Sequence, residues 1–136
     1  MNISSKLFMA TALVATTLAA SAAVDVQDVL LRKKGPDINV RVIVDNPSAS
    51  TQKGPVLVTL FVRPDSNASW SKLKVWSISK IKPGEKISRD IFSENSAILR
   101  NAANNYNWQA RATVSAPGAK GDEMSVTNSG DSNTGK

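Results

Sequence analysis

Apolar and polar residues alternate along three stretches of the chain, which predicts β-strands with one buried face. These stretches cover residues 38–45, 55–63 and 108–115. The third stretch begins at Trp108, which we place in the core because the apolar alternation continues from it. In the second stretch, Leu57 and Phe61 make the opposite face apolar as well, which favours a central or doubly covered strand.

Weaker alternation extends this pattern to about seven strands. The weaker strands cover residues 24–32, 73–81, 86–92 and 124–127. Proline, glycine, asparagine and aspartate gather between the strands, as at residues 34–37 and 82–85, and these residue types favour β-turns. Short strands separated by such turns predict an all-β fold, namely an antiparallel immunoglobulin-like β-sandwich.

The segment 93–105 departs from the strand pattern and predicts a short helical insertion. Ser93 is a suitable N-cap for this helix. Apolar residues follow it at helical spacing: Ile98, Leu99 and Ala102. The asparagine-rich stretch 101–107 is expected to end the helix, because asparagine tolerates left-handed backbone conformations.

The first 22 residues have the pattern of a secretory signal peptide. Lys6 supplies a positive charge, residues 7–20 are uncharged and largely apolar, and Ala20-Ser21-Ala22 offers a small-residue cleavage site. No apolar run in the chain is long enough for a transmembrane segment. Because cysteine is absent, we expect export to a bacterial periplasm or cell surface without disulfides. The expected organisation is a signal peptide over 1–22, a sandwich domain over 23–127 and a disordered tail over 128–136.

The chain lacks most of the side chains that ordinary active sites use. It contains no histidine and no cysteine, which removes the usual general base, thiol nucleophiles and the commonest metal ligands. Ser69 with Lys72 and Ser77 with Lys80 match the S-x-x-K motif. Both pairs fall in a predicted loop or strand, whereas that motif requires the start of a helix. We therefore expect a protein that is not an enzyme and uses no cofactor and no metal.

Positive charge is concentrated in residues 72–89. The segment contains one acidic residue, Glu85, and six basic ones: Lys72, Lys74, Lys80, Lys82, Lys86 and Arg89. Uninterrupted alternation would place the even-numbered residues 72–82 on one strand face, with Trp76 among the lysines. Trp70 lies in the polar loop before this strand, so we expect it to be the most exposed tryptophan. The candidate ligand-binding residues are Trp70, Lys72, Lys74, Trp76, Lys80 and Lys82.

Two interpretations of this face compete. In the first, Trp76 is an exposed platform on which a sugar or another ring stacks while the lysines bind anionic groups. In the second, Trp76 and Ile78 point into the core, and the lysines only protect an edge strand against pairing with other chains. The sequence leaves both interpretations open.

Three short motifs connect the chain with a known family. Val42-Ile43-Val44-Asp45-Asn46 ends one strand, residues 58–62 form the middle of another, and Ile81-Lys82-Pro83-Gly84-Glu85 precedes a third. These motifs resemble the strand end, central strand and turn of the bacterial cell-adhesion-related (CARDB-type) immunoglobulin-like domain. The resemblance implies an immunoglobulin-like sandwich over residues 40–127, and it provides no catalytic residues.

The class that these observations favour is an exported, non-enzymatic binding or adhesion module. Its basic, tryptophan-containing face is expected to bind an acidic protein or an anionic surface polymer. Nucleic acid is not an expected partner of an exported chain without a nucleic-acid-binding motif. The alternative is a structural subunit or chaperone-like accessory factor of a surface filament or envelope assembly, acting by strand addition at an open sheet edge. Segment 24–32 and the C-terminal tail 128–136 are then the candidates for a donated strand.

Overall fold

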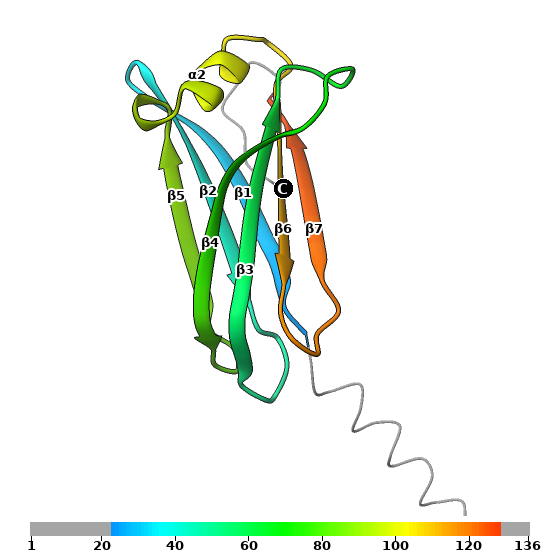
Figure 1. Cartoon of the computed structure of the whole chain (residues 1–136). Helices are drawn as coiled ribbons and strands as arrows, with labels where there is room; N and C mark the ends of the chain where they lie inside the picture. The colour runs from blue at the N-terminus through cyan, green and yellow to red at the C-terminus, as the bar shows by residue number, and fades with distance from the viewer. Residues whose placement is uncertain (1–22, 129–136) are drawn as a thin grey trace, which may run out of the picture.

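The stretches of alternating residues form seven antiparallel strands in the computed structural model, which describes residues 23–128. The strands are β1 (Asp25–Lys34), β2 (Asp37–Asp45), β3 (Gln52–Arg63), β4 (Ser71–Ile81), β5 (Lys86–Phe92), β6 (Gln109–Ser115) and β7 (Asp122–Thr127). One sheet has the order β1-β2-β5 and the other the order β4-β3-β6-β7, and the sheets pack face to face (Figure 1). The predicted β-sandwich is therefore confirmed. The predicted signal peptide and residues 129–136 of the predicted tail lie outside the described residues.

Valine dominates the core between the sheets, because its branched side chain packs well on a pleated surface. The buried apolar side chains of the central strands β2 and β3 are Val40, Val42, Val44, Val56, Val58, Leu60 and Val62. Trp108 is 2% exposed, which confirms its predicted place in the core. β3 lies between β4 and β6, but its outer face is uncovered, since Leu57 is 38% exposed. The strand is thus central and covered on one face only.

The helical insertion consists of a 3-10 turn, η1 (Ser93–Asn95), followed by the short helix α2 (Ala97–Ala103). The helix covers one end of the sandwich (Figure 1), where Leu99 and Ala102 are buried while Ile98 stays exposed. In the part of the chain that the structure describes, no helix has the length and apolar character needed to span a membrane.

Both ends of α2 differ from the prediction. The N-cap is Ser96, whose hydroxyl accepts a hydrogen bond from the Leu99 N–H at 3.2 Å. The predicted cap at Ser93 is wrong, because the Ser93 hydroxyl instead accepts a hydrogen bond from the Ile38 N–H. The predicted left-handed ending is also wrong, since the C-cap Asn104 is right-handed with φ −74°. The Asn105 side chain provides the alternative by donating to carbonyls in the last turn of the helix.

The two long sides of the sandwich differ in how the sheets meet. At one side, the Val26 N–H donates to Asp122 Oδ2 at 2.8 Å, and Ala23 forms a β-bridge with Lys120. At the other side, β4 pairs with β3 and β5 pairs with β2, so β4 and β5 are edges of different sheets. We call this second side, formed by β4, the turn at 82–85 and β5, the open side.

β1 belongs to the sandwich itself. It pairs with β2 from Asp25 to Lys34, and it buries Val26, Val29 and Leu31 in the core. Segment 24–32 is therefore not free to act as a donated strand in this structure. The sheet edges that remain available for strand addition on the open side are those of β4 and β5.

Candidate functional site

A cleft of about 450 Å³ lies on the open side, between β4 and the segment formed by β5, η1 and the N-cap of α2. Its apolar lining residues are Leu73, Trp76, Ile91 and Phe92, and its polar lining residues are Lys74, Asp90, Asn95 and Ser96. Leu73, Trp76 and Ile91 also pack against the core, which fixes the apolar part of the lining. The cleft thus combines a rigid apolar surface with charged and hydrogen-bonding groups.

Trp76 contributes to the core rather than standing free on the surface. It lies directly opposite Val58 of β3, whose side chain is buried between the sheets. Trp76 is accordingly half-buried and packs against the core, while Ile78 is buried. Trp76 and Ile78 thus point inward, as the second interpretation expects, while the role of the lysines stays a prediction. The exposed remainder of Trp76 lines the cleft.

The predicted shared face of even-numbered residues is wrong, because the pairing of β3 and β4 is interrupted at both ends. Lys72 lies opposite Phe61 and Lys74 lies opposite Leu60, with a register shift between them. Leu60 and Phe61 are successive residues of β3, so they point to opposite faces, and Leu60 is buried in the core. Lys74 therefore lies on the core side and Lys72 on the outer face. A second shift places Lys80 opposite the exposed Lys53 instead of in line with Ile78.

The basic residues nevertheless gather on the open side. Those carried by β4, by the turn and by β5 are Lys72, Lys74, Lys80, Lys82, Lys86 and Arg89. The ion pairs within residues 23–128 join Arg41 to Asp90 and Arg111 to Glu123, so no lysine of β4 has a carboxylate partner there. These positive charges are thus available to an anionic partner.

Three carboxylates gather at the end of the β1–β2 pairing. Asp25 lies opposite Asp45 in the β1–β2 pairing, and Asp122 is nearby on β7. Burial, together with the charges of Asp122 and Asp45, raises the pKa of Asp25. This acidic group is local, because Lys120 lines the same hollow as Asp25 and Asp122, and Asp45 lies opposite Lys86 of β5.

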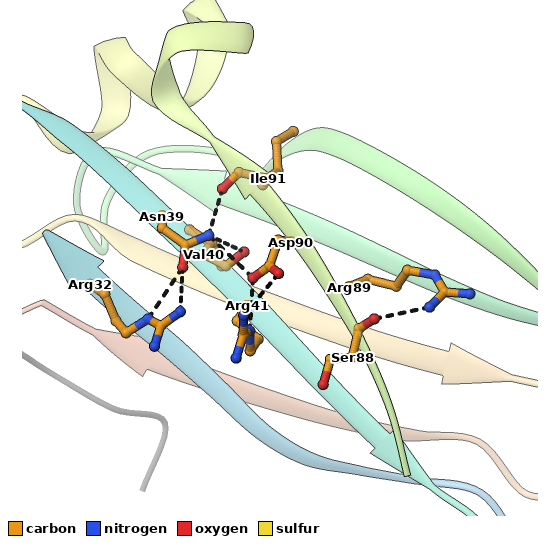
Figure 2. Close-up of polar contacts among 8 residues, drawn as sticks. All are labelled: Arg32, Asn39, Val40, Arg41, Ser88, Arg89, Asp90 and Ile91. Atoms are coloured by element: carbon orange, nitrogen blue, oxygen red, sulfur yellow. Dashed lines mark hydrogen bonds and ion pairs between the residues drawn. The ribbon is translucent and has the colours of Figure 1, made fainter. Parts of the chain in front are cut away.

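A polar cluster fixes the edge strand β5 beside the cleft (Figure 2). Arg41 donates two hydrogen bonds to Asp90, from Nε to Oδ1 at 2.9 Å and from Nη2 to Oδ2 at 3.1 Å. Asn39, which is 0% exposed, donates to Asp90 Oδ1 and to the Ile91 carbonyl, and it accepts a hydrogen bond from Arg32. The cluster joins β1, β2 and β5, so it holds the cleft residues Asp90 and Ile91 in place.

The cluster predicts a pH-dependent contribution to stability. The hydrogen bonds from Arg41 and Asn39 and the nearby charges of Arg41 and Arg32 hold the pKa of Asp90 below its usual value. A lowered native pKa means that this contribution is complete above the ordinary aspartate pKa of about 3.9 and disappears as the pH falls through the native pKa. Urea unfolding of the Asp90→Asn variant should show a loss of about 1 kcal/mol at neutral pH, which shrinks at acid pH. A loss that does not change with pH would contradict this assignment.

Trp70 lies outside the cleft. Its ring is covered by the Arg63 guanidinium, whose carbon lies 4.1 Å from the ring centre, and Arg111 approaches to 5.7 Å. Arg63 also donates to Gln109 Oε1 at 2.7 Å and to the Ala68 carbonyl. These contacts hold Trp70 partly buried beside the outer face of the second sheet, so its role in the structure is to anchor the loop before β4.

The structure brings Lys74 and Trp76 together in the cleft, leaves Lys72 and Lys80 on the outer face of β4, and places Lys82 in the adjoining turn. The sequence does not indicate the cleft residues of the opposite wall, which are Asp90, Ile91, Phe92, Asn95 and Ser96. Hydrophobic periodicity gives the face of a strand but not the edge that it meets across a sandwich, so these residues carry no signal for the cleft.

No protein-family model matches the chain, and no curated protein matches it in sequence. The resemblance to CARDB-type domains therefore stays a prediction.

Solved structures share the fold. The chain is similar to OgpA from Akkermansia muciniphila, in the complex of its catalytically inactive form with an O-glycopeptide (glycodrosocin) substrate, with a TM-score of 0.53 and 16% identity. That match covers 82% of this chain and 30% of OgpA, so the chain spans less than a third of that protein. The archaeal flagellum of Methanospirillum hungatei strain JF1 matches with a TM-score of 0.53 and 10% identity, over 93% of this chain and 84% of the other. At such identities the likeness shows the fold alone.

Proposed function

We propose that this protein is an exported, non-enzymatic module that binds an acidic protein or an anionic surface polymer through its open side. The observation that carries the proposal is the gathering, on β4, the turn and β5, of basic side chains that have no carboxylate partner within residues 23–128, around a cleft that is partly apolar. The lysines attract an anionic partner over several ångströms and raise its association rate, and the cleft supplies short-range contact area.

Two features of the molecule support this assignment. Residues 72–89 of the open side carry six basic side chains and one acidic one, so this positive charge attracts an anionic partner to that side. The cleft residues are held by strand pairing and by the Asn39–Asp90 cluster, so little ordering is needed when a partner binds. Export is part of the proposal and rests on the signal-peptide pattern of residues 1–22.

The second candidate function is a structural subunit or accessory factor of a surface filament or envelope assembly. It is favoured by the similarity in fold to the archaeal flagellum chain, together with the uncovered edges of β4 and β5. A subunit of this kind associates with copies of itself. Sedimentation velocity of the purified protein distinguishes the two functions, because assembly without any added partner is expected only for the second.

The proposed function is tested with two polyanions, poly-L-glutamate and polygalacturonate, each labelled with fluorescein. We expect fluorescence anisotropy to show binding that weakens at least about tenfold when the salt concentration rises from about 20 to about 200 mM. The Lys74→Glu/Lys80→Glu variant should lose the binding, because it reverses charge on both faces of β4.

The matched control is the Lys33→Glu/Lys120→Glu variant, which has the same net charge but alters exposed lysines away from the open side. It should retain most of the binding. Equal loss in the two variants would show that only the total charge matters and would overturn the assignment to the open side. Absence of binding to either polyanion at low salt would overturn the proposed function.

A further inference from the structure

The free edge of β4 is the longest unpaired strand edge on the open side. β4 has 11 residues and pairs along one edge with β3, whereas β5, across the cleft, belongs to the other sheet. The backbone N–H and C=O groups along the other edge of β4 are therefore available to an additional strand. A groove with a free strand edge is suited to an extended peptide.

We propose that the acidic partner is an extended peptide segment that adds to β4 as a further strand of the four-stranded sheet. This inference rests on the proposed function, because it requires an acidic partner at the open side. The segment contributes alternating side chains, with acidic ones on the outer face and apolar ones in the cleft.

The outer face selects the acidic side chains. Lys72 and Lys80 lie on that face near the two ends of β4, and neither has a carboxylate partner within the described chain. Side chains directly opposite each other on neighbouring strands lie close enough to interact, and opposite charges there are favourable. Lys80 lies eight positions after Lys72 in the chain, so a segment of about nine residues reaches both.

The cleft side selects the apolar side chains. Leu73 and Trp76 of β4 face Ile91 and Phe92 across the cleft. An apolar side chain that enters between them is removed from water, and Lys74 remains beside the cleft for one further acidic group. The partner sequence that fits both faces alternates acidic and apolar residues.

Two other occupants fit these features less well. A second copy of the chain would place its own β4 lysines beside Lys72 and Lys80, and like charges on adjacent strands are unfavourable. A polysaccharide stacks on an open aromatic face, whereas Trp76 is half-buried and packed against the core. A sugar chain also has no peptide N–H and C=O groups with which to form a strand beside β4.

The test uses a fluorescent peptide of about nine residues in which glutamate and valine alternate. It is compared with two analogues of the same sequence, N-methylated at the odd-numbered or at the even-numbered residues, because the N–H groups of the two sets point to opposite strand edges. We expect one analogue to lose at least about tenfold in affinity while the other binds like the parent peptide. Hydrogen exchange should also show new protection at amides of β4.

The other outcomes separate this inference from the proposed function. If both methylated analogues bind like the parent peptide, charge alone drives binding, and the inference is overturned while the proposed function stands. If polygalacturonate binds and no peptide does, the partner is a polymer, and the inference is again overturned. If neither peptides nor polyanions bind, the proposed function fails as well.

Discussion

Replacement of Asn46 by alanine is expected to lower the free energy of unfolding by about 3 kcal/mol. Asn46 is 0% exposed, and its side chain both donates and accepts hydrogen bonds. Its Nδ2 donates to the carbonyls of Ser50 at 2.7 Å and Ile81 at 2.9 Å. Its Oδ1 accepts hydrogen bonds from the N–H and the hydroxyl of Ser48. Alanine removes all four bonds and leaves the buried Ile81 carbonyl and the partly buried groups of Ser48 and Ser50 without this partner.

These contacts make Asn46 the link between the end of β2 and the end of β4. The backbone of Asn46 contributes as well, because its N–H donates to the Glu85 carbonyl and its carbonyl accepts from the Gly84 N–H. Asn46 therefore holds the turn at 82–85, which is part of the open side, in place. We expect Asn46→Ala to weaken polyanion binding in addition to lowering stability.

Urea unfolding monitored by tryptophan fluorescence measures the effect. The Asn67→Ala variant, which changes an exposed asparagine in the loop before β4, is the matched control and should change stability by less than about 0.5 kcal/mol. A similarly small change for Asn46→Ala would show that water replaces the four hydrogen bonds and that Asn46 does not link the sheets.

Asn46 also illustrates how far the sequence predicts this fold. The period-two pattern determines which residues of β2 and β3 point inward, so the valine core and the sandwich could be predicted from the chain alone. Asn46 and the turn at 82–85 both stood out as parts of short motifs. Their contact could not be predicted, since it depends on how two sheets meet rather than on a pattern within one strand.

The candidate site was predictable in its charge and not in its geometry. The concentration of lysines is visible in the sequence, but the alternation of residues 72–82 predicts a strand without interruptions. The register shifts around Lys72–Lys74 and Ile78–Lys80 move the lysines to different faces. Irregularities of this kind depend on how two strands pair, so the periodicity of one strand does not reveal them. The prediction of Ser93 as the N-cap of α2 is wrong for a related reason, because the Ser93 hydroxyl accepts a hydrogen bond from Ile38 of β2, which is distant in sequence.

Gly54→Ala, at the register shift opposite Ile78–Lys80, is the other substitution with a large expected effect on stability. Gly54 of β3 lies where the register shifts, opposite the end of β4, and a Cβ at this position would come within 2.6 Å of the Ile78 carbonyl oxygen and closer still to that of Ser79. Both are backbone atoms of β4, so a rotamer change cannot relieve the overlap. We expect Gly54→Ala to lower the free energy of unfolding by about 3 kcal/mol, because β4 must move away from β3.

Gly35→Ala is the matched control for Gly54→Ala. Gly35 has φ 62° and nothing within 4 Å of a Cβ, so alanine there costs only the left-handed backbone, about 1 kcal/mol. Urea unfolding should therefore rank Gly54→Ala well below Gly35→Ala in stability. Under conditions where both variants remain folded, Gly54→Ala alone should weaken polyanion binding, because its displacement falls on the strand that carries Lys80. Equal stability losses would show that β4 adjusts without leaving β3, and that the close approach at Gly54 does not determine its position.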